Sequence, residues 1–250
     1  MRAASKILLF LFLLGVAGAQ AQPDAAAQPQ GQAEEAEIEF VPSKYRILAI
    51  RPLPGVPGIQ TGFSRARYLV NFGAREGIKR GSVFQIFRKM HFVGLVHVSR
   101  VWTDTAYVRP IRLESKPDRD ALFPLLPGYQ LKPKYVMLET IHFDLGKPQF
   151  SIEMNERLHF ASRFINAFPN FPLVLEGHTD SEGDSEKNLI LSQQRAEEIK
   201  IYLNEIHFIP LVQMHIKAFG AGDPIASNAT EEGRLQNRRV DIVLMDAIPE

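Results

Sequence analysis

The sequence predicts an α+β protein in which a small all-β barrel precedes a β-α-β-α-β-β region whose helices pack on a mixed sheet. Residues 44–135 contain short β-rich runs about ten residues apart, separated by Gly, Pro and Asp and almost without helical periodicity. Residues 136–250 instead alternate strand patterns with helix patterns. The charge changes at the same place, because residues 44–135 hold 17 Lys/Arg against 5 Asp/Glu, and residues 136–250 hold 10 against 18.

The N-terminus has the pattern of a secretory signal peptide. Arg2 and Lys6 precede an apolar run at Ile7–Ala19, and the small-x-small pattern at Ala19–Ala21 is typical of a cleavage site. The alternative, an uncleaved membrane anchor, is disfavoured because the run is shorter than the roughly 20 residues that span a bilayer. We therefore expect a signal peptide at residues 1–21 and a periplasmic protein, associated with the outer membrane or the cell wall.

Residues 22–43 predict a disordered acidic linker, since they hold five acidic and no basic residues in an Ala-, Gln- and Pro-rich context. The chain contains no cysteine. This excludes disulfides, thiolate metal sites, a cysteine nucleophile and a lipid-modified N-terminal cysteine.

Residues 44–135 form the predicted barrel domain. The stretch Gly77–Lys89 resembles the small SH3-like barrels of several bacterial envelope proteins. The net charge of +12 (17 minus 5) predicts a surface for an anionic partner. Candidates are lipid phosphates, a cell-wall polymer and an acidic protein, and the acidic protein could be this chain's own linker or C-terminal half. The alternative is that solvent-facing strand residues simply carry arginine. Nucleic acid is not expected as a partner of a secreted protein.

Residues 136–250 form the second predicted domain. Apolar residues at Leu158, Ala161, Ile165 and Phe168 fall on one face of a helix that Pro169 ends. A second helix is expected to begin at Ser192 as N-cap, with its own buried stripe. Four strand patterns complete the expected order: YVMLETIHFDLG, FPLVLEGHT, MHIKAFG and NRRVDIVLM.

The stretch LEGHTDSEG concentrates polar side chains at the end of one predicted strand. His178, Asp180 and Glu182 could ligate a metal, perform acid–base chemistry or hold a charged ligand. A His-x-Asp pair also occurs at His142 and Asp144, but no metal-binding signature such as HExxH accompanies the pairs. No G-x-S-x-G nucleophile elbow or comparable catalytic motif is visible either. The residues therefore favour a ligand clamp, with no metal and no cofactor.

This part of the chain resembles the OmpA-like peptidoglycan-binding domain, over about residues 136–245. The matching elements are Gly177-His178-Thr179-Asp180, Gly183, Asn188, Leu191-Ser192, Arg195-Ala196, Pro224, Asn228, Gly233-Arg234 and Asn237-Arg238-Arg239.

The resemblance implies non-covalent binding of the peptidoglycan stem peptide through its diaminopimelate residue. Asp180 matches the aspartate that receives the ligand ammonium, and Arg195 matches the arginine that grips the ligand carboxylate. Thr179, Asn188 and Arg238 fall at positions of supporting contacts. A zwitterionic ligand needs one fixed anion and one fixed cation, which agrees with this pair. We expect Arg195 in the first turn of its helix, where free backbone N–H groups would assist.

Arg238 and Arg239 are adjacent on a predicted strand, so at most one of them faces the ligand, and the resemblance favours Arg238.

We therefore expect a non-enzymatic protein that tethers an envelope component to the cell wall, with peptidoglycan as one partner and a second envelope protein or anionic surface bound by the basic barrel. The alternatives are an accessory subunit of a larger envelope machine, such as a flagellar motor or secretion apparatus, and a cell-wall hydrolase.

Overall fold

The computed structural model describes residues 43–52, 66–114 and 125–248. The predicted signal peptide and all of the predicted linker except Ser43 lie outside these residues. Within them, no helix combines the length and the apolar character needed to cross a bilayer.

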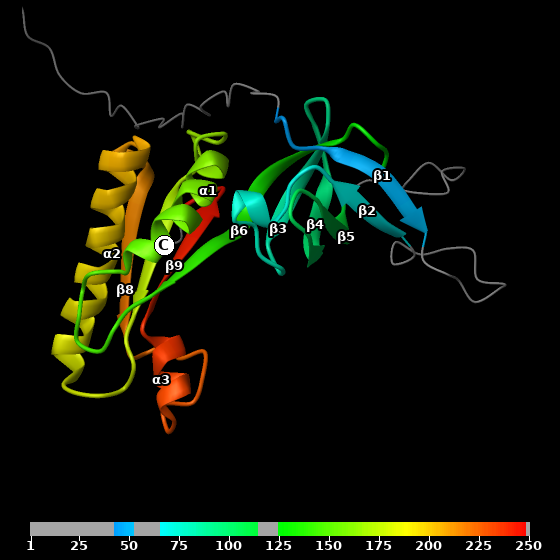
Figure 1. The fold of residues 1–250 in the computed structure, drawn as a ribbon. Helices are drawn as coiled ribbons and strands as arrows, with labels where there is room; N and C mark the ends of the chain where they lie inside the picture. Colours follow the sequence, from blue (N-terminus) through cyan, green and yellow to red (C-terminus); the bar gives the residue numbers. More distant parts are fainter. Residues whose placement is uncertain (1–42, 53–65, 115–124, 249–250) are drawn as a thin grey trace, which may run out of the picture. The chain divides into compact units, whose positions relative to one another are not determined.

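The described residues form one mixed sheet of nine strands with three α-helices, which confirms the α+β class (Figure 1). The strand order in the sheet is β1-β2-β5-β4-β3-β6-β9-β7-β8. The strands are β1 (Ile47–Pro52), β2 (Ala66–Val70), β3 (Val83–Arg88), β4 (His91–Val101), β5 (Ala106–Leu113), β6 (Gln130–His142), β7 (Leu173–His178), β8 (Met214–Gly220) and β9 (Arg239–Met245). The helices are α1 (Asn155–Ile165), α2 (Ser185–His207) and α3 (Glu231–Asn237).

The first six strands close on themselves. Backbone hydrogen bonds join the start of β1 to the segment that leads into β6: Ile47 N–H donates to Tyr129 O (2.9 Å), Gly128 N–H to Ile47 O (2.8 Å) and Leu131 N–H to Tyr45 O (2.9 Å). Alternate residues point inward and are buried, as in the BiBiB pattern of β2. This arrangement is the small barrel expected from the evenly spaced β-rich runs.

Strand β6 belongs to both halves of the sheet. Its first part pairs with β3, through Tyr135 opposite Val83, and its second part pairs with β9, from Tyr135 opposite Met245 to His142 opposite Arg239. The predicted boundary after residue 135 therefore falls inside one continuous strand. The division into residues 44–135 and 136–250 stays a prediction.

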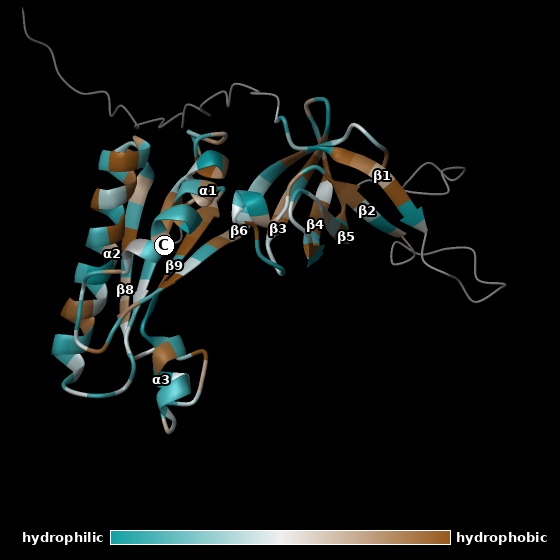
Figure 2. Cartoon of the chain, in the orientation of Figure 1, coloured by the Kyte–Doolittle hydropathy of each residue, from teal (hydrophilic) through white to brown (hydrophobic). Residues whose placement is uncertain are grey.

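The C-terminal half is built on strands β6-β9-β7-β8, in which β7 and β8 are parallel and the other pairs antiparallel. Figure 1 shows α1 and α2 on the same side of these strands. The buried residues of α1 include Leu158 and Ala161, and those of α2 include Ala196 and Ile199. Figure 2 shows polar and apolar segments alternating along α2, as expected for a helix with one buried face.

Two features differ from the expected order. The N-cap of α2 is Asp184 rather than Ser192, so the helix begins at Ser185. The Asp184 carboxylate accepts hydrogen bonds from the Glu186 and Lys187 N–H groups and so caps the helix. A third helix, α3, was not expected between β8 and β9. It has seven residues, too few to show a periodic apolar stripe, and Thr230 caps it by accepting from Gly233 N–H.

One hydrophobic core runs through both halves. Phe164 of α1 is fully buried, and its ring lies 4.9 Å from Tyr45 and 6.2 Å from Phe84 of the barrel. Phe72 stacks on Phe84 at 4.6 Å. Helix α1 therefore packs against the barrel as well as against the C-terminal sheet.

Candidate ligand-binding site

The site forms where β7 ends and approaches α2. A Cβ atom on Gly177 would lie 2.1 Å from the Ser192 carbonyl oxygen, so only glycine allows this close approach of strand to helix. Thr179 N–H then donates to Gly220 O at the end of β8 (2.8 Å). Asp180 follows immediately and is buried although it carries a carboxylate.

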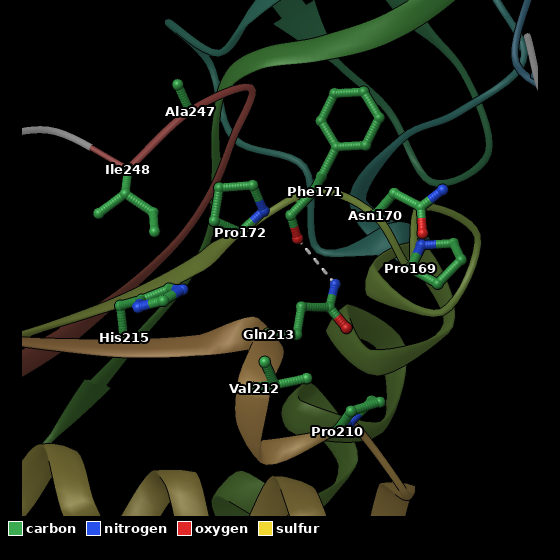
Figure 3. A pocket seen from close by; sticks show the side chains of 10 residues that line it. All are labelled: Pro169, Asn170, Phe171, Pro172, Pro210, Val212, Gln213, His215, Ala247 and Ile248. Carbon is green, nitrogen blue, oxygen red and sulfur yellow. Dashed lines mark hydrogen bonds between the residues drawn. The ribbon is translucent and has the colours of Figure 1, made fainter. Parts of the chain in front are cut away.

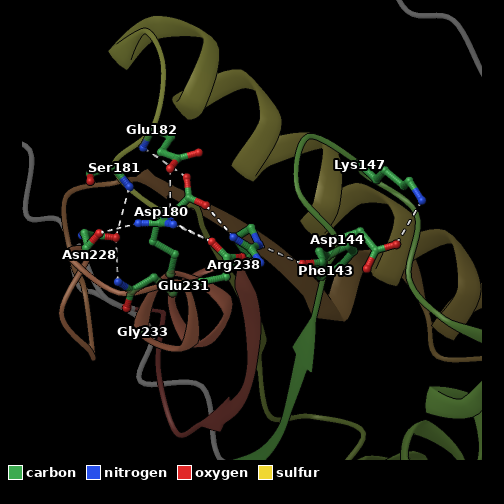
Figure 4. Close-up of polar contacts among 12 residues, drawn as sticks. Phe143, Asp144, Lys147, Asp180, Ser181, Glu182, Asn228, Glu231, Gly233 and Arg238 are labelled. Carbon is green, nitrogen blue, oxygen red and sulfur yellow. Dashed lines mark hydrogen bonds and ion pairs between the residues drawn. The ribbon is translucent and has the colours of Figure 1, made fainter.

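A buried ion pair holds Asp180. Its Oδ2 accepts from Arg238 Nη1 at 2.9 Å, and both side chains are almost fully buried. Arg238 also donates through Nη2 to Glu231 Oε1 (2.8 Å) and through Nε to Phe143 O (3.3 Å), as Figure 4 shows. The second Asp180 oxygen, Oδ1, accepts from Glu182 N–H at 3.2 Å. Each carboxylate oxygen has one protein donor and so retains acceptor capacity for a ligand.

Arg195 is fully buried and binds backbone carbonyls. Its Nε donates to Lys147 O (3.0 Å), Nη1 to His178 O (3.1 Å) and Nη2 to Asp144 O (3.0 Å). The guanidinium also lies over the Phe143 ring, 5.1 Å from its centre. One N–H on each of Nη1 and Nη2 remains for another acceptor. Arg195 thus fastens the loop after β6 to the end of β7.

The position of Arg195 corrects one expectation. It lies eleven residues into α2, in the middle of the helix, because the helix begins at Ser185. The backbone N–H groups around it are therefore used within the helix and cannot assist an anion. Burial lowers the pKa of the Arg195 guanidinium to about 10, with Arg238 acting in the same direction and Asp180 in the opposite one, so the side chain stays charged at neutral pH.

The five predicted site residues line one small cavity of about 70 Å³. Its walls are Leu145, Gly146, Thr179, Asp180, Glu182, Asn188, Leu191, Arg195 and Arg238. Arg239 does not line it, since its Nε donates to Asp241 Oδ2 at 2.7 Å on β9. The structure thus brings together residues that are up to 59 positions apart, from Thr179 to Arg238.

Two neutral side chains complete the cavity. The Thr179 hydroxyl oxygen is buried and has no hydrogen-bond partner among the described residues, so it is available to a ligand. Asn188 donates through Nδ2 to Glu182 O at 2.9 Å and thereby ties α2 to the loop after Asp180. An unpartnered buried hydroxyl is costly, which favours a ligand atom that bonds to it.

Residues of α3 and of the loop before it also support the site, and one of them, Glu231, was not predicted from the sequence. Glu231 accepts from Arg238 and also from Arg234 (2.7 Å). Asn228 Oδ1 accepts from Ser181 N–H (3.2 Å), as Figure 4 shows. It also accepts from Asn237 Nδ2 (2.9 Å), and together these bonds order the loop beside Asp180. Glu231 was missed because it lies in the helix that the sequence did not predict.

His178 lies outside the cavity and stacks on Phe219, with ring centres 4.9 Å apart and planes 3° from parallel. Neither ring nitrogen has a hydrogen-bond partner among the described residues, and Asp241 Oδ2 is 3.9 Å from Nε2. Burial, aided by the Arg239 charge, lowers the pKa of His178 to about 4, so the ring is neutral at pH 7.

The two His-x-Asp pairs do not lie on neighbouring strands, because β9 separates β6 from β7. In residues 43–52, 66–114 and 125–248, no group of three or more His, Asp or Glu side chains is arranged to hold a metal ion.

A larger hollow of about 440 Å³ lies elsewhere, between the turn at residues 169–172, the segment 210–213 and residues 247–248 (Figure 3). Its walls are mostly apolar, and Gln213 Nε2 donates to Phe171 O at 2.9 Å within it. It has no carboxylate or guanidinium in its lining and does not suit a zwitterionic ligand.

Comparison with known proteins identifies the family. Residues 142–238 match the OmpA family. Over 120 residues the chain is 40% identical to the outer-membrane lipoprotein YfiB of Pseudomonas aeruginosa, a match that covers 47% of this chain and 71% of that lipoprotein. The chain belongs to the OmpA family.

A second relative of this OmpA-family chain is the peptidoglycan-associated lipoprotein of Buchnera aphidicola. It is 31% identical over 104 residues, a match that covers 42% of this chain and 60% of the lipoprotein. The chain thus spans less than two thirds of that relative. The crystal structure of the peptidoglycan-associated lipoprotein from Burkholderia pseudomallei is 28% identical, with a TM-score of 0.41, and covers 42% of this chain and 89% of that one. The two curated relatives are named as an outer-membrane lipoprotein and a peptidoglycan-associated lipoprotein.

Proposed function

We propose that this OmpA-family chain binds peptidoglycan non-covalently and so holds an envelope component to the cell wall. One observation carries the proposal: Asp180, Arg195 and Arg238 converge on a single small cavity, together with Thr179 and Asn188. A relative named for its association with peptidoglycan supports the choice of ligand.

The charges of the cavity suit the free amino-acid end of diaminopimelate. Asp180 offers one unused acceptor site on each oxygen to the ligand ammonium, and the two remaining N–H groups of Arg195 offer a fork to the carboxylate. The Thr179 hydroxyl supplies a neutral contact. A cavity of about 70 Å³ admits the head of one such group and leaves the rest of the stem peptide outside.

Under this proposal the protein is not an enzyme, needs no cofactor and works in the periplasm at the outer membrane or the cell wall. The barrel holds a second envelope protein or anionic surface. An accessory role in a larger envelope machine is a special case of the same tether, in which the second partner is a subunit of that machine.

Co-sedimentation with purified diaminopimelate-containing sacculi tests the proposal. Wild-type protein should sediment with the sacculi, and free diaminopimelate should release it. Asp180→Ala should lose at least about tenfold in affinity, because the ligand ammonium then enters a buried site without an anion. Glu205→Gln is the matched control, since Glu205 is exposed on α2 and lies outside the cavity.

Two results would overturn the proposal. Equal sedimentation of wild type and a folded Asp180→Ala variant would show that the cavity does not hold the wall. Release of soluble peptidoglycan fragments during incubation would instead identify a hydrolase.

A further inference from the structure

Four cationic or titratable side chains form a row across the outer face of the barrel. Arg51 of β1 is directly opposite Arg67 of β2, and Arg109 of β5 is directly opposite His97 of β4. Strands β2 and β5 are neighbours, and Tyr68 pairs with Val108, so Arg67 and Arg109 lie side by side next to that pair. We call Arg51, Arg67, Arg109 and His97 the cationic row. It crosses four adjacent strands and is about 14 Å long at the usual strand spacing.

The side chains of the row point away from the barrel interior. Tyr68 and Val108 are fully buried and point into the barrel. Because side chains alternate along a strand, their neighbours Arg67 and Arg109 point outward. His97 lies between Val96 and Val98, which are both fully buried.

Within the described part of the chain, no carboxylate forms an ion pair with any member of the cationic row, and the Nε of Arg109 is buried without a hydrogen-bond partner. Three other basic residues of this region do have such partners: Arg75 with Asp104 (3.1 Å), Arg112 with Glu114 (3.0 Å) and Lys134 with Asp246 (2.6 Å). Like charges directly opposite each other on neighbouring strands are unfavourable. An external anion on this face would relieve the repulsion.

Aromatic side chains flank the row and hold arginines in place. The Arg67 guanidinium lies 5.9 Å from the centre of the Tyr107 ring, and Tyr107 contacts Trp102 edge to face at 4.8 Å. Arg100 lies 5.0 Å from the Trp102 ring, which is 38% exposed. Arginine, tyrosine and tryptophan are the residue types most enriched at the centres of protein–protein interfaces.

We propose that the cationic row, with Arg100, Trp102 and Tyr107 beside it, docks an acidic segment of another envelope protein. Glutamate or aspartate side chains of that segment would bind the guanidinium forks in bidentate fashion, and its apolar side chains would cover Trp102. A polypeptide is favoured over a lipid surface because two arginines of the site, Arg67 and Arg100, lie over aromatic rings, and the site contains no lysine. The inference rests on the proposal that the barrel holds a second partner and is independent of binding to the wall.

The test uses the full-length protein and a fluorescein-labelled glutamate-rich peptide, with binding followed by fluorescence anisotropy. The triple variant Arg51→Gln/Arg67→Gln/Arg109→Gln should bind the peptide at least about tenfold more weakly than wild type. The control variant Arg163→Gln/Lys187→Gln/Lys200→Gln removes the same charge from α1 and α2 and should bind like wild type. Arg51→Gln alone, at an exposed position, should give a smaller loss if the triple variant folds poorly.

Three outcomes would overturn the inference. One is unchanged affinity in folded row variants. Another is an equal loss in the control variant, which would show that net charge alone attracts the peptide. The third is row-dependent flotation with phosphatidylglycerol vesicles without binding to the peptide, which would assign the row to a membrane. Sedimentation with sacculi should stay unchanged in the row variants, so failure here is distinguishable from failure of the wall-binding proposal.

Discussion

At the residue scale, Arg195 has two roles in one side chain. Three of its donors bind backbone carbonyls, two in the loop after β6 and one at the end of β7, and the side chain also lines the cavity. A residue of this kind organises the site even when no ligand is bound. Its effect on ligand binding can therefore be read only after its effect on stability has been measured.

Arg195→Met should lower the free energy of unfolding by about 3 kcal/mol or more, because the change leaves three buried or half-buried carbonyls without their donor. Urea denaturation followed by circular dichroism measures the loss. Arg163→Met is the control, since Arg163 is exposed on α1 and its loss should change the free energy little. A loss below about 1 kcal/mol for Arg195→Met would contradict the assigned role.

His178 makes a pH-dependent contribution to stability. Its folded-state pKa of about 4 lies below the ordinary value of 6.5, so the unfolded chain binds the proton more readily. Stability should therefore be complete above about pH 6.5 and should fall as the pH is lowered towards 4, by at most about 3 kcal/mol from this group. Urea unfolding at about pH 7 and about pH 4.5 should show a smaller decrease for His178→Gln than for wild type. An identical decrease in both proteins would rule out His178 as the source.

At the element scale, the start of α2 decides where its side chains face. Asp184→Ala should cost about 1 kcal/mol, because the carboxylate caps two backbone N–H groups of the helix. Ser185→Ala, one residue further on and exposed, serves as the control and should change stability by a few tenths at most. Thermal or urea unfolding of the two variants measures the difference. Similar values for both would show that the cap at Asp184 contributes little.

The sequence predicts most helices and strands of this fold, but it does not predict where α2 begins or that α3 forms. Alternating apolar residues indicate the strands, and the stripe at Leu158, Ala161 and Ile165 indicates α1, although the helix ends at Ile165 and not at Pro169, so that Phe168 lies beyond it. Ser192 was the predicted N-cap of α2, but Asp184 caps the helix instead; because serine and aspartate both serve as N-caps, residue type alone does not identify the cap. Helix α3 is stabilised by long-range contacts, such as that of Asn237 with the backbone of Ile225 and Ala226, rather than by periodicity.

The same distinction applies to the site. The residue types of the cavity follow from the family resemblance, but their partners do not. Arg195 binds carbonyls 17, 48 and 51 positions away, and the Arg238 partner of Asp180 is 58 positions away. Such pairs arise only when strands and loops meet in three dimensions, so no local pattern predicts that Arg195 binds the protein backbone.

At the scale of the whole molecule, the two halves share β6 and the core around Phe164. They should therefore unfold together although their charges differ. Trp102 is the only tryptophan and lies in the barrel, while the three α-helices lie in the C-terminal half. Tryptophan fluorescence and helical circular dichroism should give coincident urea transitions. Separate midpoints would instead support two independently folding domains at residues 44–135 and 136–250.

Phe164→Ala should shift both transitions by the same amount and lower the free energy of unfolding by about 3–5 kcal/mol, the usual loss for a buried phenylalanine. The reason is that its ring contacts barrel residues as well as the C-terminal core. Phe208→Ala is the control, because that ring is 82% exposed. A shift confined to the circular dichroism signal would mean that Phe164 stabilises only the C-terminal half.

Under the proposed wall-binding function, the pairing of Asp180 with Arg238 has a consequence for how firmly a single copy would hold the polymer. An incoming ammonium does not meet a bare carboxylate; it must share one with the Arg238 guanidinium, whose positive charge repels the ammonium and reduces the net attraction. One engagement is then short-lived and easily reversed. Lasting attachment would come from several copies held close together on the same sacculus, each rebinding before its neighbours detach.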